Sequence, residues 1–474
     1  MAGDKPPNTN QERNVRKGDI LTLEIETLAF GGMGIARVNG MAVFVTNAVP
    51  GDTVSARIVK KKKQYAEARV LEILNPSPHR TDPQCRFCGF CGGCRLRILS
   101  YEKQLAYKHE QVRDALARIG AVTDAVVHPP IPARQTLAYR NKMEFSFADR
   151  RWLMPEEMDN PDADAGFALG LHVSGTFYKV LDIDRCDLFP DQGNHILCDV
   201  RNFVRQSAQP VYGLRSHEGF WRFLMLRHSV AHDQWMVNIV TAESDRSAVQ
   251  PLADHLYETC PGVVSVVNNI TAKKAGIAVG DEEVLLQGEM VIEDQLGDMR
   301  FDISANSFFQ TNTRGAETLY QVAAAYAGLK GHETVVDLYC GTGTIAIWLS
   351  GMAKSVVGIE VNKSCTTDAE INCRKNNITN VSFLTGDVKD RLREIPHRPD
   401  VMVIDPPRAG MHKDVVSQVL AMAPARIVYV SCNPATLARD AGLLAEHYTV
   451  TEVQPVDMFP HTPHIECVAR LTTV

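Results

Sequence analysis

The chain of 474 residues lacks a long apolar run, and this absence excludes integral membrane proteins. No stretch approaches the roughly 18–20 consecutive apolar residues that cross a bilayer. The N-terminal segment, MAGDKPPNTNQERNVRKGD, also has no apolar run of the kind found in secretion signals. We therefore expect a soluble, cytoplasmic protein that does not associate with membranes.

An overall excess of positive charge is missing as well. The chain has 50 Lys and Arg residues against 56 Asp and Glu, which gives a net charge of −6. A nucleic-acid-binding surface, if there is one, must therefore be local. Residues 1–74 hold 11 basic against 8 acidic residues and include the run Lys60, Lys61, Lys62 and Lys63. Taken alone, such a run is more typical of a solvated loop than of a binding site.

Cysteine is plentiful, but its distribution does not indicate a disulfide scaffold. Most of the 12 cysteines are scattered through a large chain, which favours thiols, metal ligands or catalytic groups. One dense cluster, CRFCGFCGGC, places Cys85, Cys88, Cys91 and Cys94 at intervals of three residues. This spacing predicts a metal site, and it suits both a tetrahedral zinc and an iron–sulfur cluster.

Changes of pattern divide the chain into three predicted domains. Residues 14–74 alternate short β-like runs with turns, which predicts a five-stranded OB-like barrel. Residues 75–300 predict an α+β domain that carries the cysteine cluster, with an amphipathic helix at about 101–119 that we expect to pack on the third domain. Residues 301–474 alternate apolar strands with helices, which predicts a Rossmann-like α/β domain with a terminal antiparallel hairpin. Nothing in this organisation requires more than a monomer.

Polar residues of the third domain gather where its strands end. The segment VVDLYCGTGTIAIWLS sets Gly341 and Gly343 in a turn between a strand and a helix, where the backbone can approach a ligand closely. Glu360 ends the next strand and suits ribose hydroxyls, and Asp387 ends the third strand, where it suits an adenine amine. Asp405 follows the fourth strand, in DPP. Because ligands of open α/β sheets bind at these strand ends, the set indicates S-adenosylmethionine rather than a nicotinamide cofactor.

Cys432 is the predicted nucleophile. It ends the fifth strand just before Pro434 opens a helix, whose N-terminus favours a thiolate. Carbon 5 of a pyrimidine is a weak nucleophile, but addition of a thiolate to carbon 6 places electron density at carbon 5, and a base must later remove the carbon-5 proton. Glu466 is the candidate base, with His461 and His464 as competitors for the role.

Several long motifs in this order resemble the RNA uracil-5-methyltransferases, in particular the branch that carries a TRAM domain and an iron–sulfur cluster and modifies 23S ribosomal RNA. The resemblance covers nearly the whole chain. Its motifs are the segment at about 14–74, Cys85-x5-Cys91-x2-Cys94, YRNK at 139–142, SFFQTN at 307–312, DLYCGTGT, DPPRAG, YVSCNPATLARD and DMFPHTPHIE.

The resemblance implies roles for individual residues. It makes Cys432 the nucleophile and Glu466 the base, and it places Phe308 against the extruded uracil, although Phe308 is equally compatible with a core position. It also implies that Lys60 to Lys63 grip the RNA backbone. The implied cofactor contacts are Gln310, Tyr339, Thr344, Glu360, Asp387 and Asp405.

The same resemblance implies a four-iron, four-sulfur cluster held by Cys85, Cys91, Cys94 and the distant Cys186. Cys88 departs from the family pattern and competes with Cys186 as the fourth ligand. Thr344 is a second departure, because some family members carry asparagine there.

Three other functions compete with methylation of ribosomal RNA. The same chemistry on transfer RNA is the nearest. Methylation of an exocyclic amine usually accompanies an aromatic residue after the N/D-PP motif, whereas Arg408 follows here. A non-catalytic iron–sulfur RNA-binding sensor is the third, and the joint presence of Gln310, Glu360, Asp405 and Cys432 argues against it.

Overall fold

The computed structural model describes residues 15–274, 276, 278 and 280–474, so Asn14, at the edge of the first predicted domain, lies outside the described residues. The chain forms two compact units. The first comprises the described residues up to Gly89 together with Gly93–Tyr107 and His461–Pro463, and the second comprises the rest. None of the described helices is both long and apolar enough to cross a membrane.

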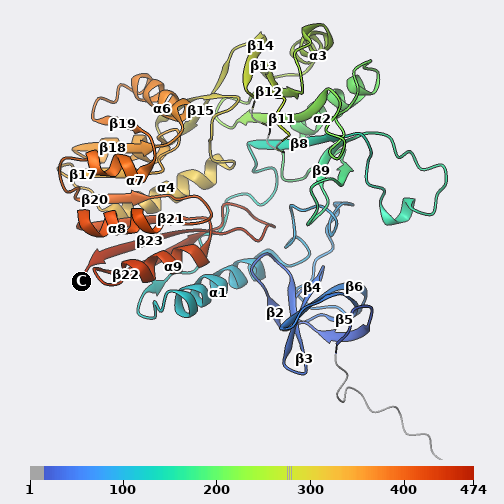
Figure 1. The fold of residues 1–474 in the computed structure, drawn as a ribbon, viewed down its shortest axis with the longest axis horizontal. Coiled ribbons are helices and arrows are strands. Elements are labelled where there is room, and N and C mark those ends of the chain that lie inside the picture. The colour runs from blue at the N-terminus through green and yellow to red at the C-terminus, as the bar shows by residue number, and fades with distance from the viewer. Residues whose placement is uncertain (1–14, 275, 277, 279) are drawn as a thin grey trace, which may run out of the picture. The chain divides into compact units, whose positions relative to one another are not determined.

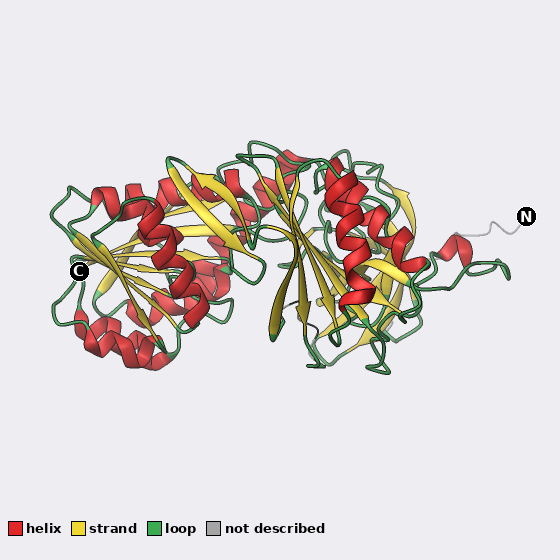
Figure 2. Ribbon diagram, turned by 90° about the horizontal axis from the view of Figure 1, so that it is seen from above, coloured by secondary structure: helices red, strands yellow, loops and turns green. Residues whose placement is uncertain are grey.

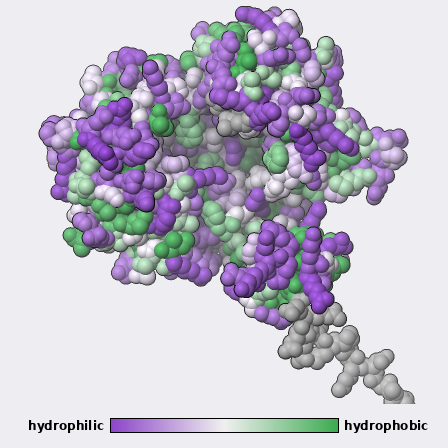
Figure 3. Space-filling model, viewed as in Figure 1, coloured by the Kyte–Doolittle hydropathy of each residue, from purple (hydrophilic) through white to green (hydrophobic). Residues whose placement is uncertain are grey.

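The first unit contains a six-stranded sheet in the order β1-β5-β6-β4-β3-β2. Alternating side chains of its strands are buried in a separate core that includes Val43, Val45 and Ala56. Hydrophilic side chains cover much of its visible face (Figure 3). The strands are β1 (Ile20–Glu24), β2 (Thr27–Leu28), β3 (Gly34–Val38), β4 (Met41–Thr46), β5 (Thr53–Lys61) and β6 (Tyr65–Asn75). The predicted number of five strands was therefore wrong by one, because the two-residue β2 has no alternation to reveal it.

The second unit contains a mixed seven-stranded sheet in the order β10-β9-β8-β11-β12-β13-β14. Two helices accompany it, α2 (Asp191–Arg205) and α3 (Arg246–Thr259). Its strands are β8 (Lys142–Ala148), β9 (Ala168–His172), β10 (Val180–Asp182), β11 (Trp221–Ser229), β12 (Gln234–Thr241), β13 (Val263–Ile270) and β14 (Glu282–Gly288). The α+β class expected for this region is confirmed, whereas a domain boundary near residue 300 stays a prediction, because both sheets of this unit belong to one compact body.

An eight-stranded sheet completes the second unit, in the order β19-β18-β17-β20-β21-β23-β22-β7. Strands β17 to β21 run parallel, and β23 pairs antiparallel with both β21 and β22. The five expected parallel strands and the terminal hairpin are confirmed. The strands are β17 (Thr334–Leu338), β18 (Ser355–Glu360), β19 (Val381–Thr385), β20 (Val401–Ile404), β21 (Arg426–Ser431), β22 (Tyr448–Val456), β23 (Glu466–Thr473) and β7 (Val126–Val127).

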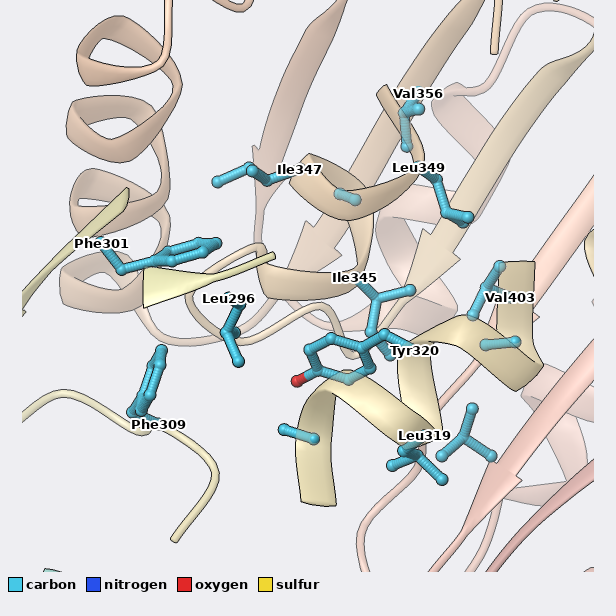
Figure 4. Packing of buried hydrophobic residues seen from close by; sticks show 14 of the residues in the cluster. Leu296, Phe301, Phe309, Leu319, Tyr320, Ile345, Ile347, Leu349, Val356 and Val403 are labelled. Atoms are coloured by element: carbon cyan, nitrogen blue, oxygen red, sulfur yellow. The ribbon is translucent and has the colours of Figure 1, made fainter. Parts of the chain in front are cut away.

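Helices cover both faces of the eight-stranded sheet (Figures 1 and 2). One face packs against α4 (Thr313–Ala327), α5 (Thr344–Leu349), α6 (Lys363–Lys375) and the hairpin of β15 (Val291–Leu296) and β16 (Met299–Ser304). Figure 4 shows Leu319 and Tyr320 of α4 beside Ile345 of α5 in this core. The other face packs against α1 (Tyr101–Ile119), α7 (Val388–Arg391), α8 (Lys413–Met422) and α9 (Pro434–Leu444).

Helix α1 has the bounds that the sequence predicts, and it packs as expected. Val112 and Leu116 lie in the same core as the apolar residues of α8 and α9. Gly120, just after α1, approaches α9 so closely that an added Cβ would lie 2.5 Å from the carbonyl oxygen of Ala438. The next strand, β7, then adds to the eight-stranded sheet beside β22. Residues 108–127 therefore add a helix and a short strand to the sheet and helices that the C-terminal third of the chain forms.

Candidate active site

The glycine-rich turn after β17 forms a cradle at the edge of the eight-stranded sheet. Tyr339, Gly341 and Gly343 have φ angles of +62°, +54° and +74°, so the backbone reverses sharply before α5 begins. A Cβ at Gly343 would come within 2.8 Å of the Phe383 ring, so this glycine is required by packing. A Cβ at Gly341 would have only a Phe308 ring atom, at 4.0 Å, within contact distance. The backbone of Gly341 is therefore open to a ligand.

The cradle lies at the point where the strand order of the sheet changes direction. Strand β17 lies between β18 and β20, so the connections leave it on both sides. Such a switch point at the carboxyl ends of parallel strands is the usual ligand crevice of open α/β sheets. The predicted residues at these strand ends are Gly341, Glu360, Asp387 and Asp405.

Glu360 connects the cradle to the next strand. Its Oε2 accepts a hydrogen bond from the backbone N–H of Gly341 at 3.1 Å, and its Oε1 accepts one from Asn362 at 2.8 Å. A carboxylate oxygen has two lone pairs, so Glu360 retains capacity for ligand hydroxyls. Asp387 caps α7 by accepting a hydrogen bond from the N–H of Lys389 at 3.0 Å and remains half exposed.

The other predicted cofactor residues flank the cradle. The backbone carbonyl of Gln310 accepts a hydrogen bond from Asn141 Nδ2 at 2.8 Å, which ties the Gln310 loop to β8. Thr344 Oγ1 lies 2.9 Å from the hydroxyl of the buried Tyr320. Burial raises the pKa of Tyr339 to about 12.

Phe308 is a surface residue rather than a core residue. Its side chain is 59% exposed, and its carbonyl accepts a hydrogen bond from Thr342 Oγ1 at 2.9 Å. This bond fixes the Phe308 loop against the glycine turn. An exposed aromatic ring beside the cradle is available to stack on a base.

Cys432 and Glu466 lie opposite each other at one end of the β21–β23 ladder. The recorded register pairs Ser431 with Cys467, and in an antiparallel pair the next step out brings Cys432 opposite Glu466. Opposite residues of such strands have Cα atoms about 4.5–5.5 Å apart. Their proximity is also visible in the pKa of Cys432, which the charge of Glu466 raises.

Neither histidine competitor has this relation to the nucleophile. Within the first unit, His461 Nδ1 lies 3.2 Å from Gln104 Nε2, and the N–H of His461 donates to Gln104 Oε1 at 2.9 Å. Within the second unit, the His464 ring packs edge-on against Phe459, with centroids 6.3 Å apart. The strand register therefore favours Glu466 as the base.

The structure opposes the expected thiolate form of Cys432. Burial, together with the negative charges of Glu466 and Asp405, raises the pKa of its thiol to about 11. Arg408 acts in the opposite direction through its charge and a hydrogen bond. Desolvation and the neighbouring acids therefore act against the N-terminus of α9, and the thiolate of Cys432 stays a prediction.

Three enclosed carboxyl groups surround the reaction centre. Burial raises the pKa of Asp405 to about 7, and burial together with Asp405 raises the pKa of Glu466 to about 8. Asp337, in the middle of the buried strand β17, also has a pKa well above its usual value, because of burial and the nearby Asp405. A backbone hydrogen bond from Ala346 acts in the opposite direction and lowers it. The charge of Asp405 therefore acts on both of the other acids.

Sequence reasoning missed Asp337 and the effect of Arg408. An acid inside the otherwise apolar run VVDLY was the available signal for Asp337, since buried acids are rare without a partner or a function. Arg408 was noticed only as the residue after the DPP motif.

The predicted metal ligands do not form a recognisable site. Among the residues that the structure describes, there is no group of three or more His, Cys, Asp or Glu side chains that could hold a metal ion. In the first unit, Cys85 and Cys88 share a turn, with the N–H of Cys88 donating to the carbonyl of Cys85 at 3.0 Å. In the second unit, Cys91 pairs with Val173 in an isolated β-bridge, and Asn194 Oδ1 accepts a hydrogen bond from the N–H of Cys186 at 2.9 Å. Sulfur is a suitable donor for iron, and the iron–sulfur cluster stays a prediction.

Some of the lysines that are predicted to contact RNA already interact with other residues of the protein. Lys60 and Lys61 lie in β5 rather than in a loop, and Lys62 and Lys63 follow in the turn to β6. Lys60 Nζ forms an ion pair with Glu67 at 2.7 Å. The positive charge that this run offers to a phosphate is therefore smaller than its composition indicates.

Comparison with known proteins agrees with this geometry. Residues 242–474 match the model of the tRNA (uracil-5-)-methyltransferase family, and residues 14–71 match the TRAM domain. An uncharacterized RNA methyltransferase of Chlorobaculum tepidum is 44% identical over 474 residues, with 98% of each chain covered. One of Porphyromonas gingivalis is 42% identical, with 95% of this chain and 99% of that protein covered.

A solved structure extends the likeness to the whole fold. The tRNA (uracil-54, C5)-methyltransferase of Pyrococcus abyssi, in complex with S-adenosyl-L-homocysteine, aligns with a TM-score of 0.75 at 27% identity. The alignment covers 95% of this chain and 100% of that one. The fold and the relatives define an RNA methyltransferase with an N-terminal TRAM domain. The chain belongs to the RNA uracil-5-methyltransferase family.

The raised pKa of Glu466 predicts a pH-dependent effect of Glu466→Gln on stability. Below about pH 4 the acid is protonated in both folded and unfolded chains. As the pH rises towards 8, the folded chain must keep a proton that the unfolded chain releases, so the wild type loses stability. Glutamine carries no such penalty.

We therefore expect the free energy of unfolding of Glu466→Gln, relative to wild type, to improve by roughly 1–3 kcal/mol between pH 5 and pH 8.5. Denaturant unfolding at both pH values measures this difference. A difference that does not change with pH would show that Glu466 is not desolvated.

Proposed function

We propose that this protein transfers a methyl group from S-adenosylmethionine to carbon 5 of a uridine in RNA, through a covalent bond between Cys432 and carbon 6. The β21–β23 ladder ends at Ser431 and Cys467, and the residues next to these two are Cys432 and Glu466. The observation that carries the proposal is this placement, together with the effect of the Glu466 charge on the Cys432 thiol. Methylation of an exocyclic amine needs no such pair, since it requires neither a nucleophilic thiol nor a base for a carbon-bound proton.

The cofactor residues fit S-adenosylmethionine. The cradle offers an open backbone at Gly341 beside the Glu360 carboxylate, which suits a nucleoside with ribose hydroxyls. Gln310, Tyr339, Thr344, Asp387 and Asp405 are proposed to complete the contacts. When bound, the cofactor supplies an electrophilic methyl group and a positive charge.

The protein's own residues perform the remaining steps. Cys432 releases its proton to solvent and adds through sulfur to carbon 6, which moves the carbon 5–carbon 6 π electrons towards oxygen 4. Arg408 lowers the pKa of Cys432 and is proposed to stabilise the thiolate. Carbon 5 then takes the methyl group as the carbon–sulfur bond of the cofactor breaks, and the electron pair of that bond stays on the cofactor sulfur. Glu466, in its carboxylate form, removes the carbon-5 proton, the electron pair restores the double bond, and the carbon 6–sulfur bond breaks to release Cys432.

Phe308 is proposed to stack on the uracil once the base leaves its helix, because its ring is exposed beside Gly341. The TRAM domain, with Lys61, Lys62 and Lys63, is proposed to hold the RNA backbone.

Ribosomal and transfer RNA remain the two candidate substrates. The family branch that carries a TRAM domain and an iron–sulfur cluster makes 23S ribosomal RNA the first proposal. The Pyrococcus abyssi relative, which aligns over its whole length, is named for a uridine of transfer RNA, and this observation supports the second. Mapping 5-methyluridine in both RNAs from a deletion strain decides between them.

Cys432→Ala should lower methyl transfer by at least about 10³-fold, since the reaction then lacks its nucleophile. Binding of S-adenosylmethionine should change little. Radiolabel transfer to RNA and calorimetric titration measure the two effects. Undiminished turnover would exclude the thiolate mechanism.

Glu466→Gln should accumulate a covalent complex between protein and methylated RNA, because the adduct forms but cannot lose its carbon-5 proton. A band that survives denaturing electrophoresis reports this complex, and Cys432→Ala/Glu466→Gln is the matched control that cannot form it. Normal turnover by the single variant would place the base elsewhere.

An iron–sulfur cluster held by Cys85, Cys91, Cys94 and Cys186 remains a proposal that rests on the family resemblance. Protein purified without oxygen should contain iron and labile sulfide, which Cys186→Ser loses and Cys88→Ser retains. Zinc without iron would overturn the assignment, and the reverse response of the two variants would make Cys88 the fourth ligand.

A further inference from the structure

A buried ion pair joins α1 to the segment that leads into Glu466. Lys108 Nζ lies 2.7 Å from Asp457 Oδ1, and the two side chains are 1% and 0% exposed. Lys108 is 349 positions away from Asp457 in the chain. Burying two charges is costly unless their geometry is well satisfied, so a pair at this place calls for a physical reason.

Asp457 of this pair directly follows Val456, the residue of β22 that lies opposite the proposed base, Glu466. Val456, the last residue of β22, pairs with Glu466, the first residue of β23. Asp457 therefore leaves the ladder beside Glu466, and its N–H donates to the carbonyl of Ile131 at 2.9 Å. The direction that the chain takes at Asp457 is fixed by both its backbone and its side chain.

The same lysine reaches a second point of this segment. Lys108 Nζ also donates a hydrogen bond to the carbonyl of Phe459 at 3.3 Å. The Phe459 ring packs against His464, two residues before Glu466. Lys108 thus holds both Asp457 and Phe459, and Phe459 contacts His464 in the segment that leads into the strand of the base.

Two neutral hydrogen bonds hold the rest of the segment. Asn312 Nδ2 donates to the carbonyl of Met458 at 2.7 Å, and the hydroxyl of Tyr139 donates to the carbonyl of Pro460 at 3.1 Å. Lys108 supplies the charged anchor, and charge-assisted hydrogen bonds are stronger and more directional than neutral ones.

We propose that Lys108 and Asp457 are positioning residues for proton removal by Glu466. They fix the 457–460 segment so that the Glu466 carboxylate reaches the carbon-5 proton of the methylated adduct. Proton transfer requires heavy atoms about 2.6–3.2 Å apart, and a displacement of 1 Å can cost about 10²-fold in rate. This inference rests on the proposed role of Glu466.

The test compares Lys108→Met, Asp457→Asn and the double variant Lys108→Met/Asp457→Asn. Each single variant leaves one buried charge without its counter-charge, so we expect a lower melting temperature and at least about tenfold lower kcat. The double variant removes both charges and should recover most of the melting temperature. It should keep the low kcat and accumulate the covalent RNA complex, with little change in KM.

Arg201→Met is the matched control. It breaks the ion pair, at 2.8 Å, between Arg201 of α2 and the partly buried Asp182 of β10, which also lies 3.7 Å from Arg205. We expect it to lower the melting temperature without accumulating the covalent complex.

The outcomes separate this inference from the proposed function. Recovery of kcat together with the melting temperature in the double variant would show a purely structural role and overturn the inference. Loss of kcat without the covalent complex would also overturn it, because the defect would then precede proton removal. If Glu466→Gln itself traps no complex, the proposed base fails, whatever the Lys108 variants do.

Discussion

The antiparallel insertion of β23 between β21 and β22 is the constraint on which the site depends. The parallel part of the sheet brings the cofactor cradle, Asp405 and Cys432 to one edge, and β23 returns along β21 in the opposite direction. Its first residue, Glu466, therefore arrives beside the last residue of β21. A slip of one residue would turn Glu466 to the other face of the sheet, so the ladder register sets the chemistry. The buried pair of Lys108 and Asp457 lies at the same end of the sheet, next to the pairing of Val456 with Glu466.

Burial is the main electrostatic influence on the acids of the site. It is the largest cause that raises the pKa of Cys432 to about 11 and that of Glu466 to about 8. Both groups are therefore mostly protonated at neutral pH, and burial also raises the pKa of Asp337. A cofactor with a positive charge would favour the ionised forms of these acids. On the proposed function, loading of the cofactor and release of protons are coupled events.

Much of the fold could be predicted from local patterns. Apolar runs bounded by turns identified the parallel strands, and the helix at 101–119 was recognised from its apolar spacing. The Gly341 turn, Glu360 and Cys432 were recognised because each lies next to a predicted strand end. The strands β2 and β7 were not predicted, because two residues are too few to show an alternating pattern of apolar and polar side chains. The spacing of the cysteines predicted a metal site, and the family resemblance implied an iron–sulfur cluster, which stays a prediction.

By itself the sequence determined the order of strands and helices, the glycine turn and the identity of the reacting side chains, because these are encoded over a few neighbouring residues. Only the tertiary structure decided that Glu466 rather than His464 lies opposite Cys432, that the Cys432 pKa is raised rather than lowered, and that Lys108 meets Asp457. Those properties depend on the residues that surround a group after folding and on the water that they exclude. Contacts across 349 positions leave no local periodicity from which to read them.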